Sequence, residues 1–224
     1  MSSTGTTVPA TLPGLDVSHH QGSVNWHVVA EAGVSFAFAK ATDGDTFVDP
    51  QFDSNWIGMK NSGIARGAYH FFRPTRPVDA QVDNFVRTVG EIGDGDLPPV
   101  LDTEEAPTPH GDSWEDIPGD ERVPMVINWL QSIEAKLGRK PIIYTRRGFV
   151  SLELPNATPL GSYLVWIAHY TTKPSPAFPD IWSNWSFWQY SEAGKVDGIA
   201  GPVDLDRFNG SATDLEKLIR TGNG

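Results

Sequence analysis

Short apolar segments alternate with amphipathic ones through the first two thirds of the chain. Runs of roughly four to eight residues rich in valine, isoleucine, phenylalanine or alanine are typical of buried strands. This pattern predicts strands at residues 14–18, 34–41, 64–72, 97–104, 141–145, 163–169, 187–190 and 203–206.

Apolar residues spaced three and four apart predict helices between the early strands. The first helix begins near Asn25 and ends at Gly33. Asp49 caps the second, Pro50 takes its first helical position and Gly63 ends it. Further helices are predicted at 82–89, 126–138 and, after a capping-box pattern, 213–220.

The intervals between the last three strands show no long helix, and residues 171–184 are dominated by proline, serine and tryptophan, which predicts a loop. Strands that first alternate with helices and then follow one another directly favour an α/β fold, a closed parallel-type barrel whose last part lacks helices. An open doubly wound sheet is the alternative, but no glycine-rich phosphate turn follows the strand at 14–18.

Length and composition narrow the class of protein. A chain of 224 residues with 39% hydrophobic residues fits one barrel-sized domain, predicted at 14–224 after a flexible leader at 1–13. The net charge of −11 argues against nucleic acid or an anionic membrane as a partner. The absence of cysteine excludes disulfides, thiolate zinc sites and a cysteine nucleophile.

No apolar run approaches the ~18–20 residues of a membrane span. The leader has neither a positively charged start nor an apolar core, so it does not resemble a secretory signal. We therefore expect synthesis in the cytoplasm.

Two acids end the apolar run at 97–104. Asp102 and Glu104 are two residues apart, so on a strand they point to the same side, ~6.5–7 Å apart along the chain. Paired carboxyl groups are what the hydrolysis of a glycosidic bond requires. The alternative is that these two acids are only solvated polar residues at the end of a strand. Asp16 and Asp204 also stand at the carboxyl ends of predicted strands, where a barrel places its catalytic groups.

A metal-dependent hydrolase is the first rival. Metal-binding barrels often use a His-x-His pair, but His19 and His20 are adjacent and would face opposite ways. His70 and His169 lie inside strands, where a structural role is favoured, and the acidic stretch 43–49 lacks the spacing of a calcium loop. We therefore predict no metal and no cofactor.

The aromatic content favours a sugar ligand. Aromatic faces pack on the apolar faces of pyranose rings, and an amide such as that of Gln189 can hold hydroxyl groups. We accept a core position for Trp56 and Trp129. For aromatic residues at the strand ends we favour a substrate groove: Tyr69, Phe71, Tyr144, Trp166, Tyr170, Trp188 and Tyr190.

Eight short motifs, in this order along the chain, resemble the motif series of the family 25 glycoside hydrolases. They are 14–18 (GLDVS), 40–44 (KATDG), 69–72 (YHFF), 101–104 (LDTE), 143–145 (IYT), 166–168 (WIA), 187–190 (FWQY) and 203–205 (VDL). The resemblance spans about residues 14–210. It implies a modified TIM-like barrel with five βα units followed by bare strands, (β/α)5(β)3. It also implies a monomeric lysozyme that hydrolyses the β-1,4 bond between N-acetylmuramic acid and N-acetylglucosamine in peptidoglycan, and thus acts on the bacterial cell wall after secretion or phage release.

Chemistry and the resemblance together suggest roles for the acids. Glu104 is the expected general acid, with its pKa raised by the aromatic groove. Asp102 is expected to stay charged and to support an oxocarbenium-like state, as nucleophile or by orienting the substrate's 2-acetamido group, the version we favour. Asp16 and Asp204 would complete the acidic base of the groove.

Two features depart from the family pattern. Asp206 stands where the family often has asparagine, a change expected to leave the chemistry untouched. The segment 106–120, with Trp114, is longer than usual and could shape the groove. Besides the metal-dependent hydrolase, two rivals stay open: a catalytically inactive wall-binding module and a chitinase-like enzyme.

Overall fold

The computed structural model describes residues 11–105 and 112–221. One sheet closes on itself through the pairing of its first and second strands, in the order β1-β9-β8-β7-β6-β5-β4-β2. The barrel strands are β1 (Thr11–Val17), β2 (Phe36–Asp43), β4 (Ala65–Phe71), β5 (Val100–Asp102), β6 (Ile142–Thr145), β7 (Leu164–Ala168), β8 (Phe187–Gly194) and β9 (Val203–Asn209). The short β3 (Phe47–Val48), which was not predicted, pairs only with the end of β2.

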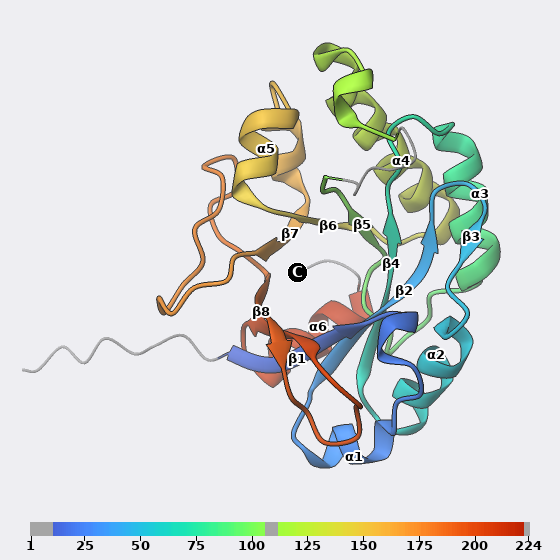
Figure 1. Cartoon of the computed structure of the whole chain (residues 1–224), viewed down its shortest axis with the longest axis vertical. Coiled ribbons are helices and arrows are strands. Elements are labelled where there is room, and N and C mark those ends of the chain that lie inside the picture. The colour runs from blue at the N-terminus through green and yellow to red at the C-terminus, as the bar shows by residue number, and fades with distance from the viewer. Residues whose placement is uncertain (1–10, 106–111, 222–224) are drawn as a thin grey trace, which may run out of the picture.

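Helices cover the barrel unevenly. A helix follows each of the first five barrel strands, whereas β7, β8 and β9 succeed one another through loops, so one side of the barrel is bare (Figure 1). The α-helices are α1 (Trp26–Glu31), α2 (Phe52–Asn61), α3 (Val78–Val89), α4 (Gly119–Leu137), α5 (Arg147–Glu153) and α6 (Ala212–Thr221). The predicted alternation followed by bare strands is therefore confirmed.

The direction of the last strand differs from a wholly parallel barrel. β1, β2 and β4 to β8 pair in parallel, but β9 is antiparallel to both β8 and β1. The cause is the short connection from β8: residues 195–202 are too few for the crossover that a parallel strand needs, so the chain turns back as a hairpin. The amino end of β9 therefore lies beside the carboxyl end of β1, and Asp204 pairs with Asp16.

Alternate residues of each strand fill the barrel interior. Phe36, Phe38 and Phe187 meet there edge to face, with ring centroids 5.2–5.8 Å apart. A Cβ atom on Gly14 would lie 2.2 Å from the Phe36 ring, and one on Gly67 would lie 2.3 Å from Phe38, so both glycines make room for these rings. The interior is a packed core below the mouth of the barrel.

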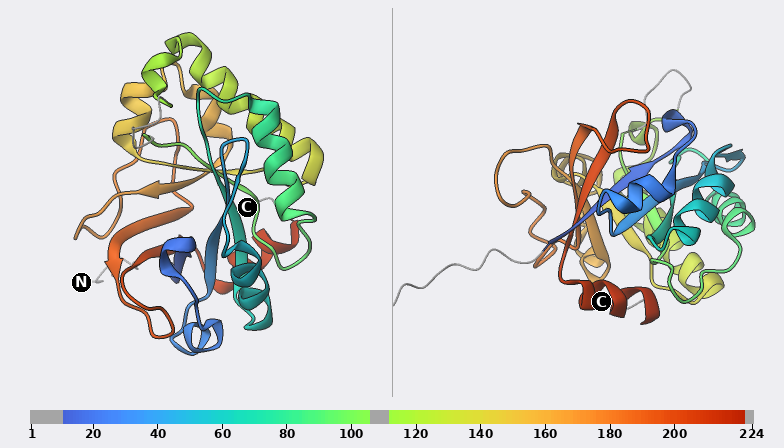
Figure 2. Two further views of the ribbon diagram at one scale, coloured as in Figure 1. Left: turned by 45° about the vertical axis from the view of Figure 1, so that its right-hand side comes forward. Right: turned by 90° about the horizontal axis from the view of Figure 1, so that it is seen from below.

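Helix α6 closes the base of the barrel. Its buried Leu215 and Leu218 belong to the same apolar cluster as the interior phenylalanines. Figure 2 shows the helix from two further sides, beneath the strands. The predicted capping box was placed two residues too late, because Ser211 and Asp214 form the reciprocal bonds: the Ser211 N–H donates to Asp214 Oδ2 at 3.0 Å, and the Asp214 N–H donates to Ser211 Oγ at 3.3 Å.

Other boundaries also differ from prediction. β1 begins at Thr11, inside the predicted leader, because Thr11 to Pro13 pair with the end of β9. Residues 1–10 of that leader lie outside the described residues. β5 ends at Asp102, two residues before the predicted end. Asp49 does not cap α2 by the usual bond; its carboxylate accepts instead from the Gln51 N–H and the His19 N–H, both at 2.9 Å.

Candidate active site

The predicted site residues converge on one groove at the carboxyl ends of the parallel strands. One cavity there, of about 460 Å³, shares lining residues with a second, and Glu104 borders both of these and a third. Ten of the residues predicted from the sequence line these cavities: Asp16, Tyr69, Phe71, Asp102, Glu104, Tyr144, Trp166, Tyr170, Gln189 and Asp204.

Glu104 lies just beyond the end of β5 and is held by its neighbours. The Thr103 N–H and hydroxyl both donate to the Tyr144 carbonyl oxygen at 2.9 Å, which continues the β5–β6 pairing past the end of β5. The indole N–H of Trp114 donates to the Glu104 carbonyl oxygen at 2.9 Å. These bonds fix the backbone on both sides of the acid, so its side chain starts from a defined position beside Asp102.

The described part of the segment 106–120 therefore supports the groove from behind. Trp114 is buried in the core against Phe72 and Phe149 rather than exposed to a ligand. None of residues 112–120 lines the three cavities, and 106–111 lie outside the described residues.

A hydrogen-bond network forms the floor of the groove around Gln189. Its Oε1 accepts from the Tyr144 hydroxyl at 2.8 Å and from the Tyr170 hydroxyl at 2.9 Å. Its Nε2 donates to Asp16 Oδ2 at 2.7 Å. Since Tyr170 is 49% exposed, the network links a side chain on the rim to an acid at the bottom.

Asp206 lies beneath this floor and was missed as a site residue. The indole N–H of Trp166 donates to its Oδ1 at 2.8 Å. Trp166 itself is buried by stacking on Phe38, with ring centroids 4.4 Å apart. The sequence signal was available, since Asp206 and Asp204 are two residues apart on one strand and so face the same way.

The electrostatics of the catalytic pair only partly match expectation. Burial, offset in part by the Arg146 charge, leaves the pKa of Glu104 raised, as expected for a proton donor. Burial, and next the Glu104 charge, also raise the pKa of Asp102 well above its usual range, although Lys40 opposes this. The groove therefore disfavours two charged acids side by side. The charged state expected for Asp102 stays a prediction.

The other acids are perturbed in the same direction. Burial, and next the Glu192 charge, raise the pKa of Asp204 to about 6. Burial, and next the charges of Asp206 and Asp204, raise the pKa of Asp16 well above its usual range. Clusters of like-charged acids with raised pKa values are typical of catalytic sites.

The family model for glycosyl hydrolases family 25 matches residues 15–199, most of the chain. This chain belongs to glycosyl hydrolase family 25. Lysozyme M1 of Streptomyces globisporus is 36% identical over 209 residues, covering 92% of this chain and 70% of its own length. The N,O-diacetylmuramidase of a Chalaropsis species is 32% identical over 221 residues, covering 93% of this chain and 99% of its own length.

Solved structures agree with the family membership. The bacterial lysozyme from Streptomyces coelicolor has a TM-score of 0.89 with this fold at 34% sequence identity, covering 96% of this chain and 99% of that one. The predicted family and barrel-like α/β fold are thus confirmed, and the chain is a glycosidase of the lysozyme and muramidase family.

A cluster of charged residues on one wall of this family 25 groove was not predicted. Asp43 accepts from Arg73 Nε at 2.6 Å and from Lys40 Nζ at 3.0 Å. Both cations lie over the Phe71 ring: the Arg73 guanidinium is 4.6 Å and Lys40 Nζ is 4.8 Å from its centroid. Lys40 and Asp43 belong to the 40–44 motif, but no pattern in the sequence indicates that Arg73 completes this charged cluster.

Arg146 stands on another side of the groove. Its guanidinium donates to the carboxylate of Glu105, and both side chains are about half exposed. The charge of Arg146 opposes the rise in the pKa of Glu104. A cation near the proton donor keeps its pKa from rising further.

Two of the predicted groove aromatics are wrong. Trp188 and Tyr190 alternate with Gln189 on β8, and because Gln189 faces the interior, both point outward. The indole N–H of Trp188 donates to the His169 carbonyl oxygen at 2.8 Å, and the Arg207 guanidinium lies over both rings.

The two histidines predicted inside strands make structural hydrogen bonds, although His169 lies just beyond the end of β7 and also borders one of the three groove cavities. His70 bonds Thr42 Oγ1 through Nδ1 at 2.7 Å and Gln81 Oε1 through Nε2 at 3.0 Å, and burial lowers its pKa to about 4. His169 Nδ1 accepts from the Ala177 N–H at 2.9 Å, which ties down the loop after β7. Among residues 11–105 and 112–221, no group of three or more histidine and acidic side chains is arranged to hold a metal ion. No helix within those ranges is long and apolar enough to cross a membrane.

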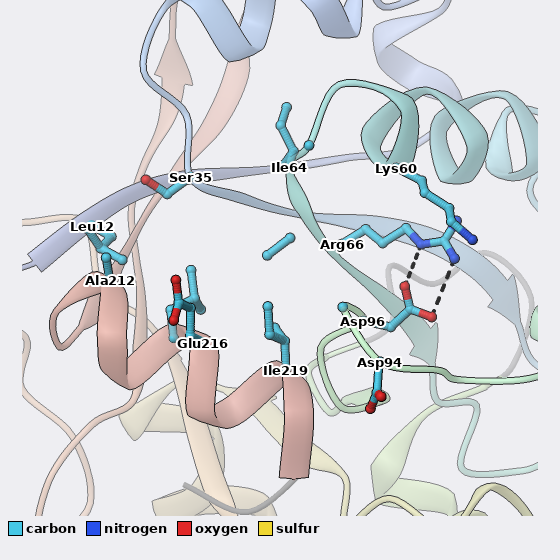
Figure 3. Close-up of a pocket in the computed structure, with 14 residues that line it drawn as sticks. Leu12, Ser35, Lys60, Ile64, Arg66, Asp94, Asp96, Ala212, Glu216 and Ile219 are labelled. Carbon is cyan, nitrogen blue, oxygen red and sulfur yellow. Dashed lines mark hydrogen bonds and ion pairs between the residues drawn. The ribbon is translucent and has the colours of Figure 1, made fainter.

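A separate cavity of about 440 Å³ lies at the base, between α6 and the amino ends of the strands. Figure 3 shows the ion pair beside it, Arg66 with Asp96. Arg66 Nε donates to Asp96 Oδ1 at 2.6 Å, Nη1 donates to the Trp56 carbonyl oxygen at 2.8 Å, and the guanidinium stacks 3.9 Å from the Trp56 ring centroid. The charges of Arg66 and Asp96 are therefore paired with each other within the protein.

Proposed function

We propose that this protein is an N-acetylmuramidase that hydrolyses the β-1,4 bond between N-acetylmuramic acid and N-acetylglucosamine in bacterial peptidoglycan. The observation that carries the proposal is the meeting of four acids, Asp16, Asp102, Glu104 and Asp204, in one groove with aromatic side chains. The relatives named lysozyme M1 and N,O-diacetylmuramidase support the same substrate class. The protein would therefore act on the bacterial cell wall.

Glu104 is the general acid in this mechanism. It borders all three cavities, so a glycan lying along the groove passes over it. Its raised pKa favours the protonated carboxyl group that a general acid needs. Glu104 gives this proton to the glycosidic oxygen as the bond to the anomeric carbon breaks.

Asp102 orients the group that attacks. Its Oδ1 is buried and meets no donor among the described residues, so an acetamido N–H of the substrate would supply the missing hydrogen bond. The acetamido oxygen then attacks the anomeric carbon as the leaving oxygen takes the proton. Lys40 favours the charged form of Asp102 as positive charge develops on the sugar.

Water completes the reaction on the same face of the sugar. Glu104, now a carboxylate, removes a proton from this water, which opens the cyclic intermediate at the anomeric carbon and restores the acetamido group. Two displacements at one carbon retain the β configuration. Direct attack by Asp102 would give the same stereochemistry. Asp16 and Asp204 complete the acidic floor and position the acetamido group and the water.

Mass spectrometry of reduced peptidoglycan fragments tests the function. A muramidase leaves every new reducing end on muramic acid, so reduction gives N-acetylmuramitol. New ends on glucosamine would contradict the proposed bond specificity. Binding to walls without new ends would indicate a wall-binding module, and equal cleavage of chitin oligomers would indicate a chitinase-like enzyme.

A further inference from the structure

The floor of the groove holds an acid that the proposed mechanism does not use. Asp206 is 1% exposed and its Oδ1 accepts from the Trp166 indole. Its Oδ2 is buried and meets no N–H or hydroxyl donor. A buried carboxylate oxygen without a hydrogen-bond donor raises the free energy of the folded state, so a hidden donor is expected beside it.

The partner available to it is another acid. The side chains of Asp206 and Asp16 lie on the same face of the antiparallel pair β1–β9, where Asp206 is opposite Gly14 and Asp16 is opposite Asp204, and the two carboxyl groups act on each other directly. Two ionised carboxylates have no hydrogen to share, which explains why Oδ2 has no donor when both are charged. One proton placed between them supplies the missing hydrogen bond and removes one of two like charges from a dry site.

The surroundings provide no other means of neutralising the two acids. The neighbouring titratable groups are Asp204 on the same strand and the phenols of Tyr69 on β4 and Tyr144 on β6. β8 contributes the amide of Gln189 and β7 the indole of Trp166, and neither carries a charge. No lysine, arginine or histidine of the described residues contributes to the pKa of either acid.

We infer that Asp206 is a positioning residue that shares one proton with Asp16, so that the two carboxyl groups act as a hydrogen-bonded pair with a single negative charge. The inference rests on the proposed function, because it assigns Asp16 its orientation in the muramidase site. Burial raises the pKa of both acids, consistent with a retained proton. Gln189 Nε2 and the shared proton then hold Asp16 from two sides, and its charge faces the groove.

Carbon-13 NMR of protein labelled at aspartate Cγ tests the shared proton without any substrate. Asp206→Asn and Asp16→Asn each remove one resonance, which assigns the pair in the wild type. At pH 7 we expect these two carboxyl groups to hold one proton between them. In Asp206→Asn we expect Asp16 to ionise at a pH lower by about one unit or more, because an amide N–H replaces the shared proton and the like charge is gone.

Kinetics of wall lysis separate positioning from packing. Asparagine can accept from Trp166 and donate to Asp16, so Asp206→Asn should keep activity within about threefold at its optimum. Leucine fills the space but cannot donate, so Asp206→Leu should lose about tenfold or more, mainly in kcat, with the acid limb of the pH profile moved upward.

Full ionisation of both acids at pH 7 in the wild type, or an Asp16 titration unchanged by Asp206→Asn, would overturn the shared proton. These NMR results do not depend on which bond the enzyme cuts, so they fail or succeed separately from the proposed function. If Asp206→Leu folds and is as active as Asp206→Asn across the pH range, the positioning role is wrong.

Discussion

At the base of the barrel, Arg66 and Asp96 bury charges of opposite sign, with exposures of 7% and 5%. At the mouth, five carboxyl groups gather with only partial compensation: Asp16, Asp102, Glu104, Asp204 and Asp206. Both regions contain buried charge on neighbouring strands of one sheet. At the base every carboxylate oxygen of Asp96 has a donor, from Arg66 or the Gly93 N–H, whereas at the mouth Asp102 and Asp206 each keep a buried oxygen without one.

This difference separates stabilising charge from functional charge. A buried ion pair with its hydrogen bonds made is costly to break but has nothing left to offer a ligand. Buried like charges with unfilled acceptors destabilise the folded state and are kept where chemistry uses them. Substitutions at the two ends should therefore have opposite consequences for stability and activity.

Glu104→Gln should have the largest effect on activity. Glutamine keeps the size of the side chain but cannot donate the proton, so wall lysis should fall about 10²–10⁴-fold while the fold is retained. Glu105→Gln is the matched control, because its partner Arg146 is about half exposed and the surface pair contributes little. Lysis by Glu104→Gln within about tenfold of wild type, in a folded protein, would remove Glu104 as the acid.

Arg66→Met should act on stability instead. It leaves Asp96 buried without its partner, so the free energy of unfolding should drop by about 3–5 kcal/mol, measured by denaturant titration. The double variant Arg66→Met/Asp96→Leu should recover much of this loss. Activity per folded molecule should stay near wild type in both. A large fall in activity at full folding would show that the base communicates with the groove.

Asp204→Asn should stabilise the folded protein near neutral pH, whereas Arg66→Met should destabilise it. The pKa of Asp204 is raised in the folded state to about 6 from the usual 3.8, so the folded protein binds this proton more tightly than the unfolded chain. Its contribution to stability is full below pH 3.8 and is lost as the pH rises through about 6. Wild-type stability should therefore fall relative to Asp204→Asn by about 1–2 kcal/mol between pH 4 and 7, after allowing for partial exposure. Parallel stability curves for the two proteins would contradict the raised pKa.

Salt should have the smallest effect, a few-fold change in the rate of wall lysis. The chain carries a net charge of −11, so walls bearing anionic polymers should repel it at low ionic strength. Salt near 0.1 M shortens the Debye length to about 10 Å, which mutes that repulsion but leaves the buried acids largely unscreened. We expect faster lysis at moderate salt and little change with short uncharged glycan fragments. Fastest lysis at the lowest salt would show that a local basic patch outweighs the net charge.

The sequence predicted much of the fold because its elements carry local signals. Apolar runs marked all eight barrel strands, and glycine ended helices near Gly33, Gly63 and Gly138. The antiparallel β9 was missed because the direction of a strand follows from the length of the connection that precedes it, not from the residues of the strand itself. β3 is only two residues long and leaves no periodic signal.

The candidate acids could be predicted because their spacing follows the two-residue period of a strand. Asp16 and Asp204 were predicted because a barrel places its catalytic groups at the carboxyl ends of its strands, although Asp204 in fact lies at the amino end of the antiparallel β9. Trp188 and Tyr190 were misplaced because aromatic content was considered without fixing which residues of β8 face inward. Arg73 was missed because its role comes from contacts between distant segments of the chain. Asp206 was missed although its spacing of two residues from Asp204 placed both on the same face of a strand.

Proton NMR of the first product of peptidoglycan hydrolysis tests the central claim most directly. Recorded before mutarotation, the spectrum identifies both the sugar at the new reducing end and its anomeric configuration. We predict N-acetylmuramic acid in the β form at the new reducing end, because attack by the acetamido group or by Asp102 retains the anomeric configuration. An initial α product would contradict both versions of the role of Asp102, and a glucosamine end would contradict the proposed bond.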